Sequence, residues 1–162
     1  GLIFVVYIAT KENTMWKKIG AITLVLFFSY IVNAQNADDI CGYWRTLKGN
    51  TQFHITKNEN GLYSITIVWL RIKKDRTDAN NPNPNLRNRK FLQLVISDNI
   101  VFLKDKNKWV GTIYDPESGN TYNCKLHFEE DKDILKLKGS LKGVRALAHE
   151  TICIREKRLR TD

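Results

Sequence analysis

The chain of 162 residues is poor in the residue types that build most catalytic and metal sites, with only three histidines and three cysteines. His54 and His127 alternate with apolar residues on separate predicted strands, so both are expected to point to solvent and to make a poor transition-metal site. The sequence has no Ser/His/Asp or Cys/His set, glycine-rich phosphate loop or metal-binding motif. A hydrolase-like enzyme is therefore the least favoured class, and we expect a non-enzymatic protein without a cofactor.

The chain also lacks an apolar run of the roughly 20 residues that a membrane-spanning helix needs. Its most hydrophobic segment, residues 19–30, follows Met15 and the pair Lys17-Lys18, and it precedes the small-residue sequence Val32-Asn33-Ala34. This order predicts a secretory signal peptide over residues 15–34. An uncleaved N-terminal anchor is the alternative.

The remaining parts of the chain follow from that assignment. Residues 1–14 lie upstream of the only methionine and are interpreted as a mistranslated segment. Residues 35–162 are expected to form a single domain, secreted or periplasmic, with no integral membrane segment after cleavage.

Basic residues exceed acidic ones, at 26 against 17. Three of these lysines and one glutamate fall before residue 35, so the mature domain keeps a net charge of about +7. The basic residues are scattered along the chain, which favours an ordinary solvated surface. The alternative is an anionic partner such as phospholipid head groups or acidic glycans; nucleic acid is not expected in an exported protein.

Helices have little room in the mature chain, which is dominated by short alternating hydrophobic runs separated by turn residues. This pattern is typical of an antiparallel all-β domain. We expect a turn at Ser97-Asp98-Asn99 and about nine strands, at residues 42–46, 51–57, 62–71, 91–96, 100–104, 109–115, 121–129, 134–140 and 151–155.

The connections are so short that neighbouring strands must pair as hairpins, and a long meander has to hide its two edges. We therefore predict an up-and-down β-barrel of about eight to ten strands. Residues 73–90 are the exception, because Pro82 and Pro84 in a polar, asparagine-rich stretch predict a long loop with a short helical turn at Leu86–Arg89. In 121–129 the alternation places Tyr122 and its i+2 neighbours on the interior face.

The triplet Gly42-Tyr43-Trp44 resembles the GxW opening of lipocalin-like barrels. There the glycine lets the strand bend while the tryptophan covers one end, and a basic residue of the last strand packs over the ring. The resemblance implies that Gly42, Trp44 and Arg155 close the barrel, with Lys157 as the alternative cation. An ordinary buried tryptophan would explain the triplet equally well.

Three longer strings occur in a characteristic order: Ile67–Leu70, Asn80–Arg89 and Trp109–Leu126, the last with the turn TIYDPxSGxTY. Together they resemble the uncharacterised exported bacterial proteins of the family called domain of unknown function 2147. The resemblance extends from Asp38 to about Arg155. It implies a lipocalin-like barrel and transfers no catalytic residue.

Some positions depart from that family's pattern. Lys90 and Gln93 stand where similar sequences tend to have proline and glycine, and Cys41 and Cys153 are unexpected as cysteines. An oxidising compartment permits one disulfide among three cysteines, and the sequence cannot choose the pair. Because the first and last strands are neighbours in a closed barrel, we advance Cys41–Cys153 as a hypothesis.

The polar motifs admit both structural and chemical interpretations. Asp115 and Gly119 suit a tight hairpin turn, although Asp115 and Glu117 could form a carboxylate pair or help to bind calcium. Arg87 and Arg89 could grip a carboxylate or phosphate, although such arginines more often pin a loop to nearby carbonyls or acids.

These observations favour a monomeric, non-enzymatic binder of a small apolar or amphipathic ligand, or of an envelope partner at the barrel rim. The alternative is an envelope interaction or structural module with a packed barrel, in which residues 73–89 dock onto a partner. The aromatic candidates could equally belong to the core. The candidate ligand or partner residues are Trp44, Trp69, Arg87, Arg89, Trp109 and Tyr122.

Overall fold

The computed structural model describes residues 36–72, 74–140 and 149–161. The predicted signal peptide and the segment upstream of it lie outside these residues. The strands are β1 (Gly42–Thr46), β2 (Thr51–Lys57), β3 (Tyr63–Leu70), β4 (Val95–Leu103), β5 (Lys108–Asp115), β6 (Asn120–Phe128), β7 (Ile134–Ser140) and β8 (His149–Glu156).

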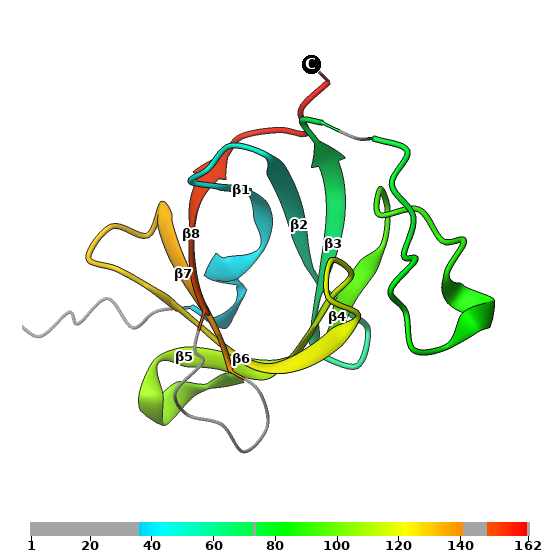
Figure 1. The fold of residues 1–162 in the computed structure, drawn as a ribbon. Coiled ribbons are helices and arrows are strands. Elements are labelled where there is room, and N and C mark those ends of the chain that lie inside the picture. The colour runs from blue at the N-terminus through cyan, green and yellow to red at the C-terminus, as the bar shows by residue number, and fades with distance from the viewer. Residues whose placement is uncertain (1–35, 73, 141–148, 162) are drawn as a thin grey trace, which may run out of the picture. The chain divides into compact units, whose positions relative to one another are not determined.

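All eight strands form one closed antiparallel barrel, in which each strand pairs with the next along the chain and β1 pairs with β8 (Figure 1). The predicted all-β meander closed into a barrel is therefore confirmed. The described residues also contain three short 3₁₀ helices: η1 (Ala37–Ile40), η2 (Pro84–Leu86) and η3 (Lys104–Lys106). None of the helices among the described residues has the length and apolarity to cross a membrane.

The structure corrects the prediction between residues 91 and 104. One strand, β4, replaces the two expected strands, and the predicted turn at 97–99 lies inside it. The polar residues there serve the neighbouring strand, because the Asn99 side chain accepts from the Thr112 backbone N–H at 3.0 Å and donates to Thr112 Oγ1 at 2.7 Å. Gly111 makes room for this contact, since a Cβ there would lie 2.8 Å from the Asn99 carbonyl oxygen.

The connection between β3 and β4, residues 71–94, is called the long loop below. An isolated bridge between Thr77 and Lys90 closes its base. Its helical turn begins earlier than predicted because Asn83 caps the turn, accepting from the Asn85 N–H at 3.1 Å, and Pro84 occupies the first position. Gln93 has a φ of 68°, in the left-handed region that favours glycine.

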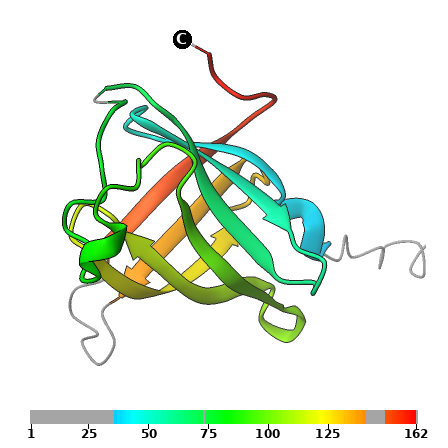
Figure 2. The same ribbon diagram turned by 90° about the vertical axis from the view of Figure 1, so that its right-hand side faces the viewer.

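One end of the barrel is closed by aromatic side chains. Trp44 and Trp109 are fully buried and contact Phe128. Their indole N–H groups donate to carbonyls at the two ends of η1, from Trp44 to Ile40 at 2.8 Å and from Trp109 to Ala37 at 3.0 Å. The two tryptophans thus fill this end of the barrel and hold η1 there. Figure 2 shows η1 at that end.

Arg155 covers Trp44. Its guanidinium carbon lies 4.2 Å from the centroid of the Trp44 ring, and its N–H groups donate to the carbonyls of Cys41 and Asp39. Gly42, at a φ of 128°, lies close to the same guanidinium, since a Cβ there would come within 3.3 Å of it. The three residues assigned to barrel closure therefore lie together, with Arg155 in contact with the other two.

All three cysteines are free thiols, and the hypothesis of a Cys41–Cys153 disulfide is wrong for this structure. The register explains why: Cys153 lies opposite Thr46, at the far end of β1 from Cys41. Five residues of extended chain span about 16 Å, whereas a disulfide needs Cα atoms within about 7 Å. Adjacent strands were predicted, but not the position of each cysteine along them.

Candidate functional site

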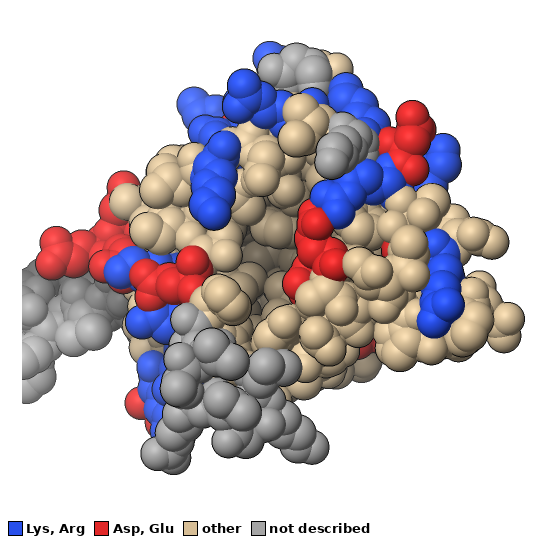
Figure 3. Space-filling view, viewed as in Figure 1, with Lys and Arg blue, Asp and Glu red and all other residues tan. Residues whose placement is uncertain are grey.

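The end of the barrel opposite η1 opens into a cavity of about 530 Å³. Figure 3 shows the molecule hollowed at this mouth, with basic and acidic side chains along its edge. Successive inward positions of several strands supply the walls, which is why the lining is mostly apolar. The apolar lining residues are Phe53, Ile67, Leu70, Phe91, Ile96, Ile113 and Leu137.

The interior between the cavity and the aromatic end is filled. Ile65, Ile100, Cys124 and Leu126 are all buried in the same core cluster as Trp109. Tyr122, Cys124 and Leu126 face inward as the alternation predicted, and the cavity is confined to the mouth. The interior of the barrel is thus packed with side chains toward the η1 end and open at the mouth.

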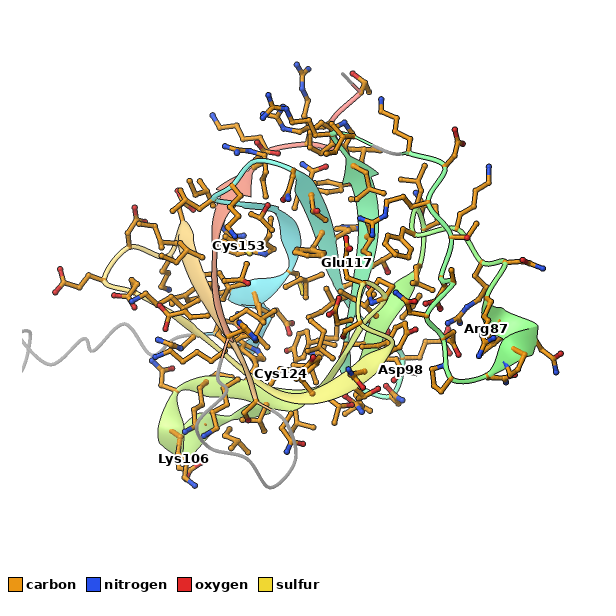
Figure 4. The ribbon with its side chains drawn as sticks, in the orientation of Figure 1. Arg87, Asp98, Lys106, Glu117, Cys124 and Cys153 are labelled. Carbon is orange, nitrogen blue, oxygen red and sulfur yellow. The ribbon has the colours of Figure 1, made fainter. Side chains whose placement is uncertain are left out.

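The turn between β5 and β6 forms one side of the mouth. Asp115 organises it, accepting from the Glu117 N–H at 3.0 Å and from the Ser118 hydroxyl at 2.7 Å. Glu117, which Figure 4 shows beside the hollow, forms an ion pair with Arg76 of the long loop. The two carboxylates therefore have separate structural partners and are not arranged as an acid–base pair.

This turn and the long loop are packed directly against each other. The Asn80 side chain donates to the Glu117 carbonyl at 2.6 Å. Gly119 has a φ of 72°, and a Cβ there would lie 2.0 Å from the Asn80 carbonyl oxygen. The second and third family strings thus meet at the mouth.

Replacing Gly119 with alanine is expected to lower the free energy of unfolding by at least about 2 kcal/mol, because the positive φ is strained and the methyl group must displace Asn80. Urea unfolding monitored by tryptophan fluorescence measures the loss. Gly61→Ala is the matched control, since Gly61 has a φ of 81° but nothing within 4 Å of its Cβ position. Equal losses in the two variants would contradict the close packing at Gly119.

A buried carboxylate, Asp78, anchors the long loop to the barrel wall. It is fully buried and accepts from the Tyr114 hydroxyl at 2.5 Å, the Arg89 guanidinium at 2.8 Å and the Asn81 amide at 2.7 Å. Burial acts to raise the pKa of Asp78, but these hydrogen bonds outweigh it and hold the pKa below its ordinary value.

Tyr114 is the partner of Asp78 on β5. Burial, followed by the hydrogen bond to Asp78, raises the pKa of the Tyr114 phenol to about 12. The phenol therefore stays protonated near neutral pH and donates to the carboxylate. Because Tyr114 also lines the cavity, the anchor and the mouth share a residue.

The two arginines of the second family string make contacts within the long loop. Arg87 donates from Nε to the Asn81 carbonyl at 2.8 Å, and Arg89 binds Asp78. Figure 4 shows Arg87 on the outer side of the loop, away from the hollow. Neither arginine lines the cavity.

The four aromatic candidates occupy three different places. Tyr122 lines the cavity, while Trp44 and Trp109 lie in the closed end. Trp69 faces the outside of the barrel, where the Arg160 guanidinium lies 5.2 Å from its ring centroid. A bulge in the pairing between Gln52 and Phe53 shifts the register of β3 at this point, so Trp69 leaves the inward face on which Ile65 and Ile67 lie.

Two of the thiols are too deeply buried to act as nucleophiles. Burial raises the pKa values of Cys124 and Cys153 to about 12, which leaves almost no thiolate near neutral pH. His54 stacks on Tyr43 with ring centroids 4.3 Å apart, and His127 approaches Glu129 at 3.6 Å. Within residues 36–72, 74–140 and 149–161, no cluster of three metal-binding side chains is found.

Sequence reasoning missed the residues that hold the mouth together, namely Arg76, Asp78 and Asn81. They lie in a polar stretch without periodicity, so nothing in their own neighbourhood marks them as buried or paired. The sequence held only an indirect sign of these contacts, namely that the strings Asn80–Arg89 and Trp109–Leu126 occur together. The structure shows that these two regions are in contact, through Tyr114 with Asn81 and Asp78.

Comparison with protein families gives a match over residues 42–155 to the model described as "Uncharacterized protein conserved in bacteria (DUF2147)". No curated protein gives a significant match. Among solved structures, a Helicobacter pylori protein, HP1028, described as belonging to the lipocalin family, is similar with a TM-score of 0.63 and 20% identity over 73% of this chain and 83% of that chain. At this identity the likeness concerns the fold.

Proposed function

We propose that this chain, which belongs to the DUF2147 family of bacterial proteins, is a non-enzymatic protein that binds a small apolar or amphipathic ligand in the mouth of its barrel. The observation that carries the proposal is the apolar cavity of about 530 Å³ at the mouth. Ligand sites in proteins are typically concave, mostly apolar and of roughly 300–1,000 Å³, so the size and lining suit one small molecule.

The arrangement of polarity supports an amphipathic ligand in particular. The walls carry Phe53, Ile113 and Leu137, whereas Lys48, Thr51 and other polar residues stand at the edge. A ligand with an apolar body and a polar end could bury the body and leave its polar end at the rim. The lipocalin-like fold supports the same class of function at a general level.

The place of action is part of the proposal. The signal-peptide pattern over residues 15–34 supports export to the periplasm or the outside of the cell. Native mass spectrometry of protein purified from its own host tests for a resident ligand. A co-purifying lipid or lipophilic metabolite supports the binder, whereas a clean apo mass in every preparation favours an interaction module.

Filling the cavity should remove binding. Ile113→Trp places an indole in the cavity and is expected to weaken binding of the fluorescent apolar probe N-phenyl-1-naphthylamine at least about tenfold, a loss of about 1.4 kcal/mol. Probe titration by fluorescence measures this affinity in the wild type and in the variant.

Val101→Trp is the matched control for that experiment. Val101 is 42% exposed on the neighbouring strand β4, so the same enlargement there leaves the cavity open. We expect wild-type affinity in this variant. Equal loss in both variants, or undiminished binding in Ile113→Trp, would place the probe outside the mouth and defeat the proposal.

A further inference from the structure

We propose that one side of this barrel, next to the mouth, docks onto the surface of an anionic lipid bilayer. Three of the large hydrophobic residues that the described chain leaves exposed lie there: Leu47 at 57%, Ile72 at 63% and Leu159 at 40%. They belong to the β1–β2 turn, the segment after β3 and the segment after β8. This surface is called the docking face, and the inference goes beyond ligand binding and does not depend on it.

The three segments of the docking face adjoin. Leu47, Arg71 and Arg160 line one shallow pocket on the outside of the barrel, and the Arg71 N–H donates to the carbonyl of Asn50 at 3.0 Å. Leu159 directly precedes Arg160. Figures 1 and 2 agree on this arrangement, since the β1–β2 turn, the end of β3 and the C-terminal segment lie together at the top in both views.

Leu159 is held outward by a buried amide. Gln52 is fully buried under the C-terminal segment, where its side chain donates to the Arg158 carbonyl at 3.0 Å and accepts from the Arg160 N–H at 3.0 Å. Both residues that flank Leu159 are thus fixed to one side chain. The leucine is presented to the exterior by the local structure and does not simply lie on a loose end.

Leu47 is presented in a similar way. It occupies a tight turn in which the Gly49 N–H donates to the Thr46 carbonyl at 2.7 Å, and Gly49 has a φ of 70°. The turn therefore fixes the direction of the apolar side chain.

Basic side chains surround these aliphatic residues. Lys48, Arg71, Lys157 and Arg158 are all exposed. Among the residues that the structure describes, none of these four has an ion-pair partner within 4.0 Å. Figure 3 shows the gathering of Lys and Arg at the top of the molecule.

The carboxylates nearby do not cancel this charge. Glu156 is already bound to two arginines, Arg45 at 2.8 Å and Arg160 at 3.0 Å. Asp75 is exposed a few residues after Ile72 and approaches Lys90 at 3.8 Å. The docking face therefore carries net positive charge, which is complementary to acidic phospholipid head groups.

Single aliphatic side chains separated by cations suit a bilayer better than a protein surface. Protein interfaces bury a contiguous core, whereas a membrane interface accepts isolated apolar side chains into the acyl boundary while lysine and arginine reach the phosphates. Lys48 also lines the cavity, so docking would bring the mouth close to the membrane.

Vesicle flotation tests the proposal, with vesicles of phosphatidylcholine alone and of phosphatidylcholine with phosphatidylglycerol. We expect the purified protein to float only with the anionic vesicles, and less at high salt because screening weakens the attraction. Two triple variants should each lower the bound fraction at least about tenfold. One removes basic side chains, Lys48→Gln/Arg71→Gln/Arg158→Gln, and the other removes aliphatic side chains, Leu47→Ser/Ile72→Ser/Leu159→Ser.

Matched controls come from elsewhere on the barrel. Lys104→Gln/Lys106→Gln/Lys108→Gln removes three charges at the β4–β5 turn, far from the docking face in Figure 4, and Val95→Ser/Val101→Ser removes exposed apolar groups from β4. Both should float like the wild type. Because every changed residue of the docking face is exposed, thermal melts should stay unchanged.

Three outcomes would overturn the inference. The protein does not float with anionic vesicles, it floats equally well with neutral vesicles, or the control variants lose as much vesicle binding as the docking-face variants. Tight binding of poly-glutamate without binding of anionic vesicles would identify an acidic protein as the partner instead.

Discussion

Trp44→Ala should lower the free energy of unfolding by about 3–5 kcal/mol, the usual loss for a buried tryptophan in a core. The indole is fully buried, contacts Phe128, lies under the Arg155 guanidinium and donates to the Ile40 carbonyl. Its removal leaves a cavity at the closed end and takes away one of the hydrogen bonds that hold η1. Urea unfolding monitored by circular dichroism measures the shift of the midpoint.

Two comparisons make this result specific. Trp44→Phe keeps most of the volume but loses the hydrogen bond to η1, so it should fall between wild type and alanine. Tyr43→Ala changes the neighbouring residue, which stacks on His54 on the outside of the barrel, and should lose less than about 1.5 kcal/mol. A Trp44→Ala midpoint equal to that of Tyr43→Ala would show that the closed end does not depend on Trp44.

Asp78→Ala should be the most damaging change in the long loop, with an expected loss of about 3 kcal/mol. The substitution leaves Tyr114, Asn81 and Arg89 without their shared acceptor. The loss falls at the lower end of the range for a buried ion pair because the Arg89 side chain is 40% exposed and can regain water. Asp75→Ala, at a carboxylate that is 99% exposed, is the control and should be nearly neutral.

The same anchor should make stability depend on pH. The folded protein holds the pKa of Asp78 below its ordinary value, so the stabilisation is fully present above the unfolded pKa of about 4. It is lost as the pH falls through the lower folded value. Urea midpoints measured downward from about pH 5 should fall more steeply in wild type than in Asp78→Ala. Parallel curves would contradict the assigned charge state.

Alternation and short turns were enough to predict most strands. The expected ranges 42–46, 51–57 and 134–140 coincide with β1, β2 and β7. The failure at β4 has a local cause, because Ser97-Asp98-Asn99 has the composition of a turn while Asn99 bonds to Thr112 on the adjacent strand. Such a contact depends on strand register, which composition does not encode.

The site was harder to predict than the fold. Periodicity placed Tyr122 correctly on the inward face, but it could not foresee the bulge that turns Trp69 outward. The Asp78–Tyr114 hydrogen bond joins residues 36 positions apart in the chain. The alternation around Tyr114 predicts a strand, but it does not indicate a partner in the polar stretch that holds Asp78. The positive φ of Gln93 was not foreseen either, because a glutamine gives no local sign of a conformation that glycine adopts without strain.

The pairing of β1 with β8 has a consequence for how this chain folds. Arg45 on the first strand binds Glu156, 111 residues later, while each of the other strand pairings joins consecutive strands of the chain. Closing so long a segment has an entropic cost that the hairpins between consecutive strands do not share, so we expect the β1–β8 seam to form last. Until that last seam forms, both edge strands remain open templates for intermolecular pairing, and the period of greatest aggregation risk is the interval before closure.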